Sequence, residues 1–218
     1  ALNIAAKEKN PNVLFHSDGV QAFMHICTDM KNLGVDLYSI SAHKVHGTKG
    51  VGALYIKNGV SFTPFIYGGG QQENKRSGTV NVPGIIAFGE AVSSLKSGFA
   101  DNLKDIKEKY ISLLSRISDI KIICPDSAPN ILSIAFLGVK ASSLQNALEN
   151  DVILGKGSAC TSRSSKVSHV LDAIGLPLNI AEATVRISFG AHNTLEEAET
   201  AVEKIEHFVN YLRKYKRK

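Results

Sequence analysis

The chain has 218 residues, of which 44% are hydrophobic, and a formal net charge of +5 at neutral pH. This length and composition indicate a globular protein with one substantial core, or with one core and a smaller companion. No apolar stretch approaches the roughly 20 residues of a membrane-spanning helix, and the N-terminus lacks the pattern of a secretory signal. We therefore expect a soluble, cytoplasmic protein that does not act at a membrane.

The chain begins at Ala1, inside "ALNIAAKEKN", a segment that is typical of the end of a helix rather than its start. We expect the sequence to be a piece of a longer protein. Between residues 13 and 56, short apolar runs alternate with polar or helical spacers. Runs of this kind, bounded by Gly and Asp, predict strands that are buried on both faces, as in an α/β sheet covered by helices.

Residues 63–84 are rich in glycine and polar residues and predict a long ordered loop. From about 84 to 116 the apolar residues keep helical spacing, interrupted by Gly98. This pattern predicts one long helix, or two with a bend, that crosses from one domain to the next. We place the boundary there, with one domain over 1–95 and a smaller α+β domain over 96–218.

The second domain is expected to mix strands and helices. Its last helix should begin with a capping box made by Thr194 and Glu197. The segment around Cys160 is rich in small polar residues, which favours a mobile loop. The other expected elements are strands near 120–126, 128–136 and 184–190, a helix near 141–150, the run 151–160, and a helix near 164–174 that ends at Gly175.

Lys44 follows an apolar run in "SISAHK". Ligands of open α/β sheets bind beyond the carboxyl ends of strands, where Ser41, His43 and Lys44 would emerge together. Asp18 and Gln21 in "FHSDGVQ" would leave a neighbouring strand. An amine, a carboxylate, an amide and hydroxyl or imidazole donors form the set that pyridoxal phosphate requires, so this edge is the candidate cofactor site.

Five segments of the chain, in this order, resemble motifs of pyridoxal-phosphate cysteine desulfurases of the NifS/IscS type, in the class V aminotransferase superfamily. They are "FHSDGVQAF", "GVDLYSISAHKVHGTKGVGALYI", "GGGQQENKRSGTVNVPGI", "GKGSACTSRSSKVSHVL" and "VRISFG". The resemblance implies the C-terminal portion of a fold-type I enzyme. Such a portion has part of a mostly parallel sheet of the large domain and a smaller α+β domain.

The resemblance also implies roles for the residues of the cofactor site. Lys44 matches the Schiff-base lysine, and Asp18 matches the acid that keeps the ring nitrogen protonated. Gln21 matches the donor to the phenolic oxygen, while Ser41 and His43 match phosphate ligands. Taken alone, Asp18 could simply end a strand and Lys44 could be a surface lysine. The combination of these residues favours the functional interpretation.

Three further residues receive roles in the same way. Thr79 resembles the residue that reaches the phosphate of the neighbouring subunit in the family's homodimer. Arg186 matches the binder of the substrate carboxylate, although an arginine in an alternating strand more often forms a surface salt bridge. Cys160 matches the nucleophile, although a single cysteine is most often a small buried hydrophobe. Cys27 and Cys124 are interpreted as packing residues.

The implied reaction removes sulfur from L-cysteine, leaving L-alanine and a persulfide on Cys160 for an acceptor protein. An iron–sulfur scaffold, a tRNA-thiolating enzyme and a cofactor-sulfurating protein are all open as acceptors, and no direct nucleic acid contact is expected. His43 and His46 have no third ligand at metal spacing, so no metal site is expected. The cysteines have no paired spacing, so we expect no disulfide framework.

The motifs that precede "FHSDGVQ" in the family are missing from the chain. We therefore expect little or no desulfurase activity from this polypeptide unless another fragment completes the domain. Two alternatives stay open. The chain could belong to another class V enzyme, a selenocysteine lyase or an aminotransferase. It could also be a catalytically incomplete fragment that only binds partners.

Overall fold

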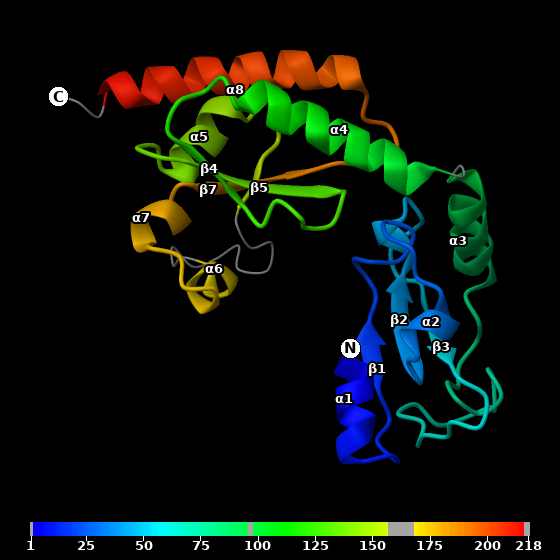
Figure 1. The fold of residues 1–218 in the computed structure, drawn as a ribbon. Coiled ribbons are helices and arrows are strands. Elements are labelled where there is room, and N and C mark those ends of the chain that lie inside the picture. Colours follow the sequence, from blue (N-terminus) through cyan, green and yellow to red (C-terminus); the bar gives the residue numbers. More distant parts are fainter. Residues whose placement is uncertain (1, 96–97, 157–167, 216–218) are drawn as a thin grey trace. The chain divides into compact units, whose positions relative to one another are not determined.

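The computed structural model describes residues 2–95, 98–156 and 168–215, and the chain divides into two compact units (Figure 1). We call residues 1–97 the N-terminal unit and residues 98–218 the C-terminal unit. Each contains helices and a sheet of its own, so the predicted α/β class is confirmed. No helix within the described ranges is long and apolar enough to span a membrane.

The N-terminal unit contains a three-stranded sheet in the order β1-β2-β3. β1 and β2 are parallel, with Asp18 opposite Ser39, and β2 and β3 are antiparallel. The predicted spacer after β1 forms turns and one four-residue helix. The elements of this unit are α1 (Leu2–Lys9), β1 (His16–Asp18), α2 (Met30–Leu33), β2 (Leu37–Ser41), the 3₁₀ helix η1 (Ala42–Lys44), β3 (Gly52–Ile56) and α3 (Val82–Ser94).

The prediction that these strands are buried on both faces is wrong: β3 is exposed from Gly52 to Tyr55, both ends of β1 are exposed, and only Tyr38 of β2 is buried. The buried cluster of this unit lies instead at the end of β2, where Ala42 and Val45 of the η1 region pack against Phe88 of α3. Among the described residues, no layer covers β3. Its apolar sequence therefore faces solvent instead of a second layer of helices.

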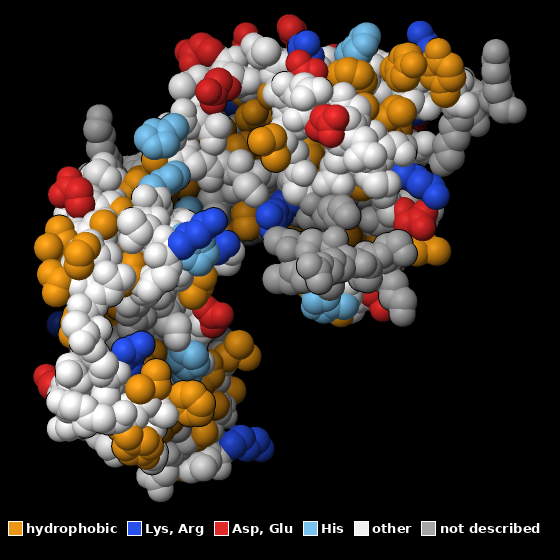
Figure 2. Space-filling view, turned by 180° about the vertical axis from the view of Figure 1, so that it is seen from behind, with side chains coloured by type: hydrophobic (Ala, Val, Ile, Leu, Met, Phe, Trp, Pro, Cys, Tyr) orange, Lys and Arg blue, Asp and Glu red, His pale blue; other side chains and the backbone are white. Residues whose placement is uncertain are grey.

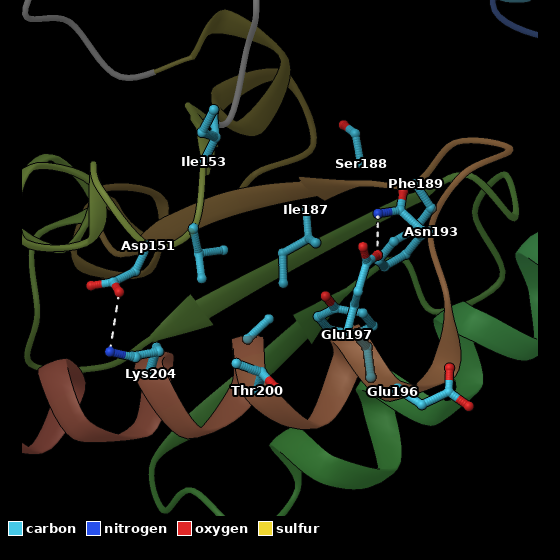
Figure 3. Close-up of a pocket in the computed structure, with 13 residues that line it drawn as sticks. Asp151, Ile153, Ile187, Ser188, Phe189, Asn193, Glu196, Glu197, Thr200 and Lys204 are labelled. Atoms are coloured by element: carbon cyan, nitrogen blue, oxygen red, sulfur yellow. Dashed lines mark hydrogen bonds and ion pairs between the residues drawn. The ribbon is translucent and has the colours of Figure 1, made fainter.

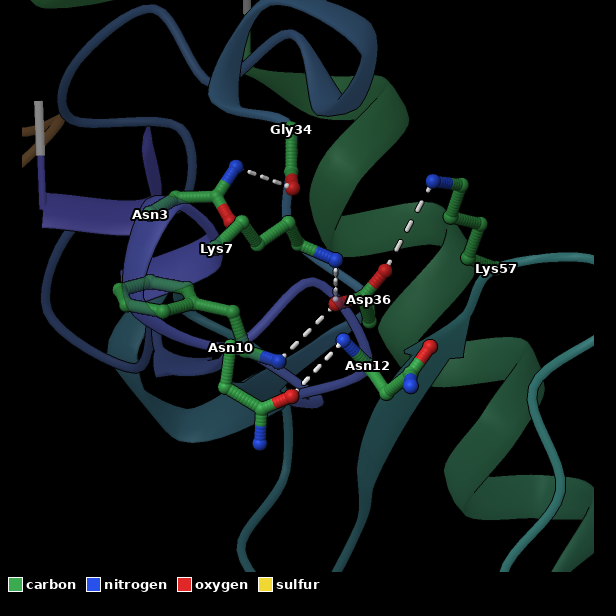
Figure 4. A network of polar contacts seen from close by, with 8 residues as sticks. Asn3, Lys7, Asn10, Asn12, Gly34, Asp36 and Lys57 are labelled. Atoms are coloured by element: carbon green, nitrogen blue, oxygen red, sulfur yellow. Dashed lines mark hydrogen bonds and ion pairs between the residues drawn. The ribbon is translucent and has the colours of Figure 1, made fainter. Parts of the chain in front are cut away.

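Polar contacts hold α1 against the sheet, because this helix has no buried residue (Figure 4). Asn3 donates a hydrogen bond of 2.6 Å to the carbonyl oxygen of Gly34. The Lys7 ammonium lies 2.7 Å from a carboxylate oxygen of Asp36, which also accepts from the backbone N–H of Phe15. Asp36 is buried, so the N-terminal unit encloses one carboxylate that joins three segments of the chain.

The C-terminal unit contains a fully antiparallel sheet in the order β4-β5-β7-β6. Figure 1 shows α4 and α8 side by side over one face of this sheet, with α6 and α7 on the other side. The elements are α4 (Phe99–Leu114), β4 (Ile120–Ile123), β5 (Ile131–Phe136), α5 (Ala141–Leu148), β6 (Gly155–Lys156), α6 (His169–Ala173), α7 (Leu178–Ala181), β7 (Thr184–Ser188) and α8 (Leu195–Tyr215).

Alternation along the strands explains the core of this unit. Leu132, Ile134 and Phe136 of β5 are buried, as are Val185 and Ile187 of β7. These residues share one face because side chains alternate along a strand. They pack under α4, α5 and α8, which agrees with the predicted α+β arrangement.

Two details of helix ends test the sequence analysis. The predicted helical region from 84 to 116 is two helices, α3 and α4, and Gly98 occupies the N-cap of α4 with φ of +86°. The capping box of α8 is confirmed. The N–H of Glu197 donates to the Thr194 hydroxyl at 3.3 Å, and the N–H of Thr194 donates to the Glu197 carboxylate at 3.1 Å.

Candidate functional site

The polar residues predicted for the cofactor site emerge at one edge of the N-terminal sheet. Because β1 and β2 are parallel, their carboxyl ends lie at the same edge. Asp18 is the last residue of β1, and Ser41 is the last residue of β2. The N–H of Gly19 donates to the carbonyl oxygen of Ser39 at 2.9 Å, which ties the turn after β1 to β2.

The short helix η1 presents His43 and Lys44 at this edge. Ala42 and Val45, on either side of them, are almost completely buried and anchor the helix in the core. His43 is exposed and Lys44 is half-buried. The Ser41 hydroxyl and Nδ1 of His43 are hydrogen bonded at 2.7 Å, so these two side chains form a joined polar pair.

Asp18, the last residue of β1, and Gln21, in the turn that follows, are both exposed. A carboxylate oxygen of Asp18 accepts a hydrogen bond of 2.9 Å from the N–H of Val20. The carbonyl oxygen of Gly19 accepts from the N–H groups of Ala22 and of the residue that follows it. These bonds fix the turn, so that the carboxylate and the amide stay at the carboxyl edge of the sheet.

His25 is a buried neighbour of this edge that the sequence analysis did not assign. Burial lowers the pKa of its imidazole, a hydrogen bond with the backbone of Phe23 opposes this shift, and electrostatic interactions with His46 and Lys44 lower the pKa further. A buried imidazole with a lowered pKa therefore lies within electrostatic range of Lys44. Its only sequence signal is its place in the segment between the two parallel strands.

Thr79 is exposed and lies in the segment 57–81. Because β3 is antiparallel to β2, this segment starts at the edge of the sheet opposite to Lys44 (Figure 1). Thr79 therefore does not follow directly from the carboxyl end of β1 or β2. The residues of η1 and of the turn after β1 do.

Arg186 lies in β7 of the C-terminal unit, between Ser133 of β5 and Gly155 of β6. Alternation puts it on the face opposite to Val185 and Ile187. Its guanidinium lies over Gly155, where an added Cβ would be 3.2 Å from Nε. This Nε is buried and has no hydrogen-bond partner among the described residues, so a strong donor is available on this face.

The structure bears on the predicted roles of two of the three cysteines. Cys160 lies outside the described residues. The interpretation of Cys27 and Cys124 as packing residues is wrong, because both thiols are exposed. Cys27 lies in an exposed stretch after the turn, and Cys124 follows the last residue of β4 with a φ of +52°. The apolar neighbours of both residues had suggested burial.

The C-terminal unit also contains a hollow of about 660 Å³ (Figure 3). Asp151 and Lys204 form an ion pair of 3.1 Å at this hollow. Its remaining lining residues are Tyr110, Val152, Ile153, Ile187, Ser188, Phe189, Asn193, Glu196, Glu197, Thr200 and Ala201. None of these lining residues belongs to the predicted site.

Across the described parts of the chain, no group of three His, Cys, Asp or Glu residues could hold a metal ion.

Comparison with known families decides the relationship. The family described as aminotransferase class-V matches residues 2–200. The chain belongs to the class-V aminotransferase family. The resemblance inferred from the five sequence segments is therefore confirmed at the level of the family.

Individual class-V relatives are similar over nearly the whole chain. A cysteine desulfurase IscS of Clostridium botulinum (strain Hall) is 40% identical over 204 residues, which cover 89% of this chain and 51% of that protein. A solved structure of a NifS-like protein superposes with a TM-score of 0.84 at 36% identity, covering 96% of this chain and 56% of that one. A structure of SspA in complex with cysteine has a TM-score of 0.71 at 30% identity, and the match covers 88% of this chain and 54% of that one.

The chain spans about half the length of the curated relatives that it matches. Similarity to NifS-like structures confirms the predicted fold-type I architecture. The carboxyl edge of β1 and β2 lies within the part of the chain that the family matches, as does Arg186.

Proposed function

We propose that the chain is part of a pyridoxal-phosphate-dependent cysteine desulfurase, which takes sulfur from L-cysteine and releases L-alanine. The observation that carries this proposal is the sheet edge where Asp18 follows β1 and the residues from Ser41 to Lys44 follow β2. Similarity to IscS and to NifS-like proteins supports it. The related SspA structure contains cysteine, which agrees with L-cysteine as the substrate.

The donor set at this edge fits pyridoxal 5′-phosphate. The cofactor requires an amine for its aldehyde, an acid for its ring nitrogen, and donors for its phenolic oxygen and phosphate. Lys44 would supply the amine, Asp18 the acid and Gln21 the phenolic donor. The hydrogen-bonded pair of Ser41 and His43 would bind the phosphate.

Each residue has a separate task in the proposed reaction. When bound, the cofactor supplies a sink for the electron pair that is released at the substrate α carbon. The Lys44 amine moves the α proton, and the Asp18 carboxylate keeps a proton on the ring nitrogen. The forked donors of Arg186 bind the substrate carboxylate. The Cys160 thiolate attacks the substrate sulfur, so that the carbon–sulfur bond breaks and a sulfur–sulfur bond forms. The electron pair of the broken bond stays with the substrate β carbon, which takes up a proton to become the methyl group of alanine.

The proposal extends to partners, domains and location. Thr79 would bind the phosphate held by a second subunit of a homodimer, and the persulfide would pass to a sulfur-acceptor protein. Residues 1–95 would form part of the cofactor domain and residues 96–218 the small domain, which the division into two compact units supports. Three cysteines without paired spacing are typical of a reducing compartment, so we propose the cytoplasm.

Alanine release from L-cysteine with added pyridoxal phosphate tests the activity. It should be measured on the 218-residue chain and on the longest reading frame that contains it. We expect little or no turnover by the chain alone and clear turnover by the longer protein. Lys44→Ala in the longer protein should abolish both turnover and the visible absorption band of the cofactor. Absence of turnover in the longer protein contradicts the proposal.

Two variants separate the alternatives. Cys160→Ala should abolish turnover of L-cysteine if the thiol takes the sulfur. Full activity of this variant would favour another class V reaction, which needs no protein thiol. A longer protein that shows no cofactor absorption band, and no change on Lys44→Ala, would instead favour a fragment that only binds partners.

A further inference from the structure

Gly19 is buried at the start of the turn that carries Asp18 and Gln21. Its N–H donates to Ser39, and its carbonyl oxygen accepts from Ala22. The backbone of Gly19 is not in the positive-φ region, unlike nine other glycines of the described chain. The glycine at this position is therefore not required by backbone conformation, and its small size must have another reason.

The reason is the phenol of Tyr38. A Cβ built on Gly19 would overlap Cζ, Cε1 and Oη of Tyr38, so this ring occupies the place where a side chain at position 19 would lie. Tyr38 is only 3% exposed and belongs to β2, the central strand of the sheet. In the register of β1 with β2 it faces Ser17, next to Asp18.

The phenol also lies near the charged end of the turn. Burial raises the pKa of Tyr38, and the negative charge of Asp18 raises it further, which shows that the two groups are close. The Tyr38 hydroxyl has no partner with hydrogen-bond geometry among the described residues, although Thr28 is near. Packing in the central strand therefore holds the ring in place.

We infer that Tyr38 and Gly19 are a size-matched pair that sets the position of the turn bearing Asp18 and Gln21. The ring is anchored in the central strand and supports the turn from below, and Gly19 lets the turn settle directly on it. Tyr38 is a positioning residue, because it acts through the turn. The consequence for the cofactor rests on the proposed function, whereas the packing of the pair does not.

A larger residue at position 19 must move either the turn or the ring. The ring is held inside the sheet, whereas the turn is exposed on its outer side, so the turn is the part that yields. Gly19→Ala should therefore displace the Asp18 carboxylate. Tyr38→Leu removes the ring atoms that the new Cβ would meet, so the double variant should return the turn to its place.

The experiment is a double-mutant cycle of Gly19→Ala and Tyr38→Leu, made both in the 218-residue chain and in the longest reading frame that contains it. Gly89→Ala is the matched control, because Gly89 is exposed in α3 and an added Cβ there meets nothing within 4 Å. The first readout, on the chain without cofactor, is amide hydrogen exchange of Ala22 and Phe23. We expect exchange to be about tenfold faster in Gly19→Ala, restored in the double variant, and unchanged in the control.

The second readout is pyridoxal phosphate binding by the longer protein. Gly19→Ala should weaken binding about tenfold and shift the pH at which the absorption band of the cofactor changes, since the Asp18 carboxylate sets the protonation of the ring. The double variant should recover both. A variant that is merely less stable would not shift the pH midpoint.

The outcomes separate the two ideas. If Gly19→Ala exchanges like the control, or if Tyr38→Leu fails to rescue it, the size-matched pair is wrong. Suppose that amide exchange is faster in Gly19→Ala and restored in the double variant, while neither the parent nor any variant of the longer protein binds pyridoxal phosphate. The size-matched pair then stands and the proposed function fails.

Discussion

The two units differ most in how they bury their apolar residues. In the N-terminal unit the buried hydrophobic residues are few, namely Val35, Tyr38, Ala42, Val45, Phe88 and Ala91. The C-terminal unit has a continuous core between its sheet and three helices. Its fully buried large side chains include Leu103, Ile106, Leu114, Leu132, Ile134, Phe136, Leu144, Leu148, Val185, Val202 and Ile205.

Exposed apolar residues show the same difference. Phe65 and Tyr67 of the N-terminal unit are 96% and 72% exposed, and Ile86 of α3 is 66% exposed. Hydrophobic side chains gather on the surface of this unit in Figure 2. Apolar surface of this kind is typical of contact with another polypeptide segment. The unit that carries the proposed cofactor residues is therefore the one with less core of its own.

The largest effect is expected from the core of the C-terminal unit. Phe136→Ala should destabilise this unit by about 3–5 kcal/mol, because the side chain is completely buried in β5 and its loss leaves a cavity. Amide hydrogen exchange of β5 and α8 during urea titration measures the change for this unit alone.

Phe65→Ala is the matched control for that substitution, since Phe65 is almost fully exposed in the N-terminal unit. It should change stability by less than about 0.5 kcal/mol. If the two substitutions reduced stability by similar amounts, the conclusion that the C-terminal unit has the larger core would be incorrect.

A polar group should be the strongest single support of the N-terminal unit. Asp36→Asn should destabilise this unit by about 2–3 kcal/mol, because it removes the buried negative charge that accepts hydrogen bonds from Lys7 and from the N–H of Phe15. Exchange of the β1 and β2 amides measures the loss. An exposed carboxylate, Glu8 of α1, serves as the control through Glu8→Gln.

The same carboxylate predicts a pH dependence. The hydrogen bond from Lys7, together with the N–H of Phe15 and the charge of Lys57, lowers the pKa of Asp36 below its ordinary value. A lowered pKa stabilises the folded state above the unfolded-state pKa of about 4, and this stabilisation is lost as the pH falls through the folded-state pKa. The N-terminal unit of Asp36→Asn should lack this part of the acid sensitivity, and an unchanged acid profile would contradict the assignment.

The sequence predicted the C-terminal unit better than the N-terminal one, for a physical reason. In the C-terminal unit local signals and tertiary packing agree, as in the Thr194 capping box and the alternation of β7. Apolar runs near residues 37–56 also predicted strands correctly. They could not show that β3 is exposed, because burial depends on which segments pack over a strand and not on the strand itself.

The candidate site was predictable where topology determines it. Two parallel strands must end at one edge, so Asp18 and Lys44 could be assigned to the same edge from the pattern alone. Packing partners distant in sequence were not predictable. Nothing local shows that the Tyr38 ring fills the space beside Gly19, or that His25 is buried near Lys44.

Lys107 gives the C-terminal unit a buried charge of its own. Its ammonium donates to the carbonyl oxygens of Pro125 and Ser127 at 3.0 and 2.9 Å and to the Ser127 hydroxyl at 3.0 Å. Lys107→Met should destabilise this unit by about 1–2 kcal/mol, because the acceptors lose their donor while the cost of burying the charge disappears. Lys104→Met, at an exposed position of the same helix, should be close to neutral in the same exchange measurement.

The smallest effect concerns a helix end in the C-terminal unit. Thr194→Ala should destabilise α8 by about 1 kcal/mol, because the N–H of Glu197 loses the hydroxyl that accepts its hydrogen bond. Exchange of the first-turn amides of α8 should accelerate while β5 amides respond less, and Thr194→Ser should restore most of the loss. Equal acceleration throughout the unit would show that the cap supports the whole core, and no acceleration would show that the capping box contributes nothing.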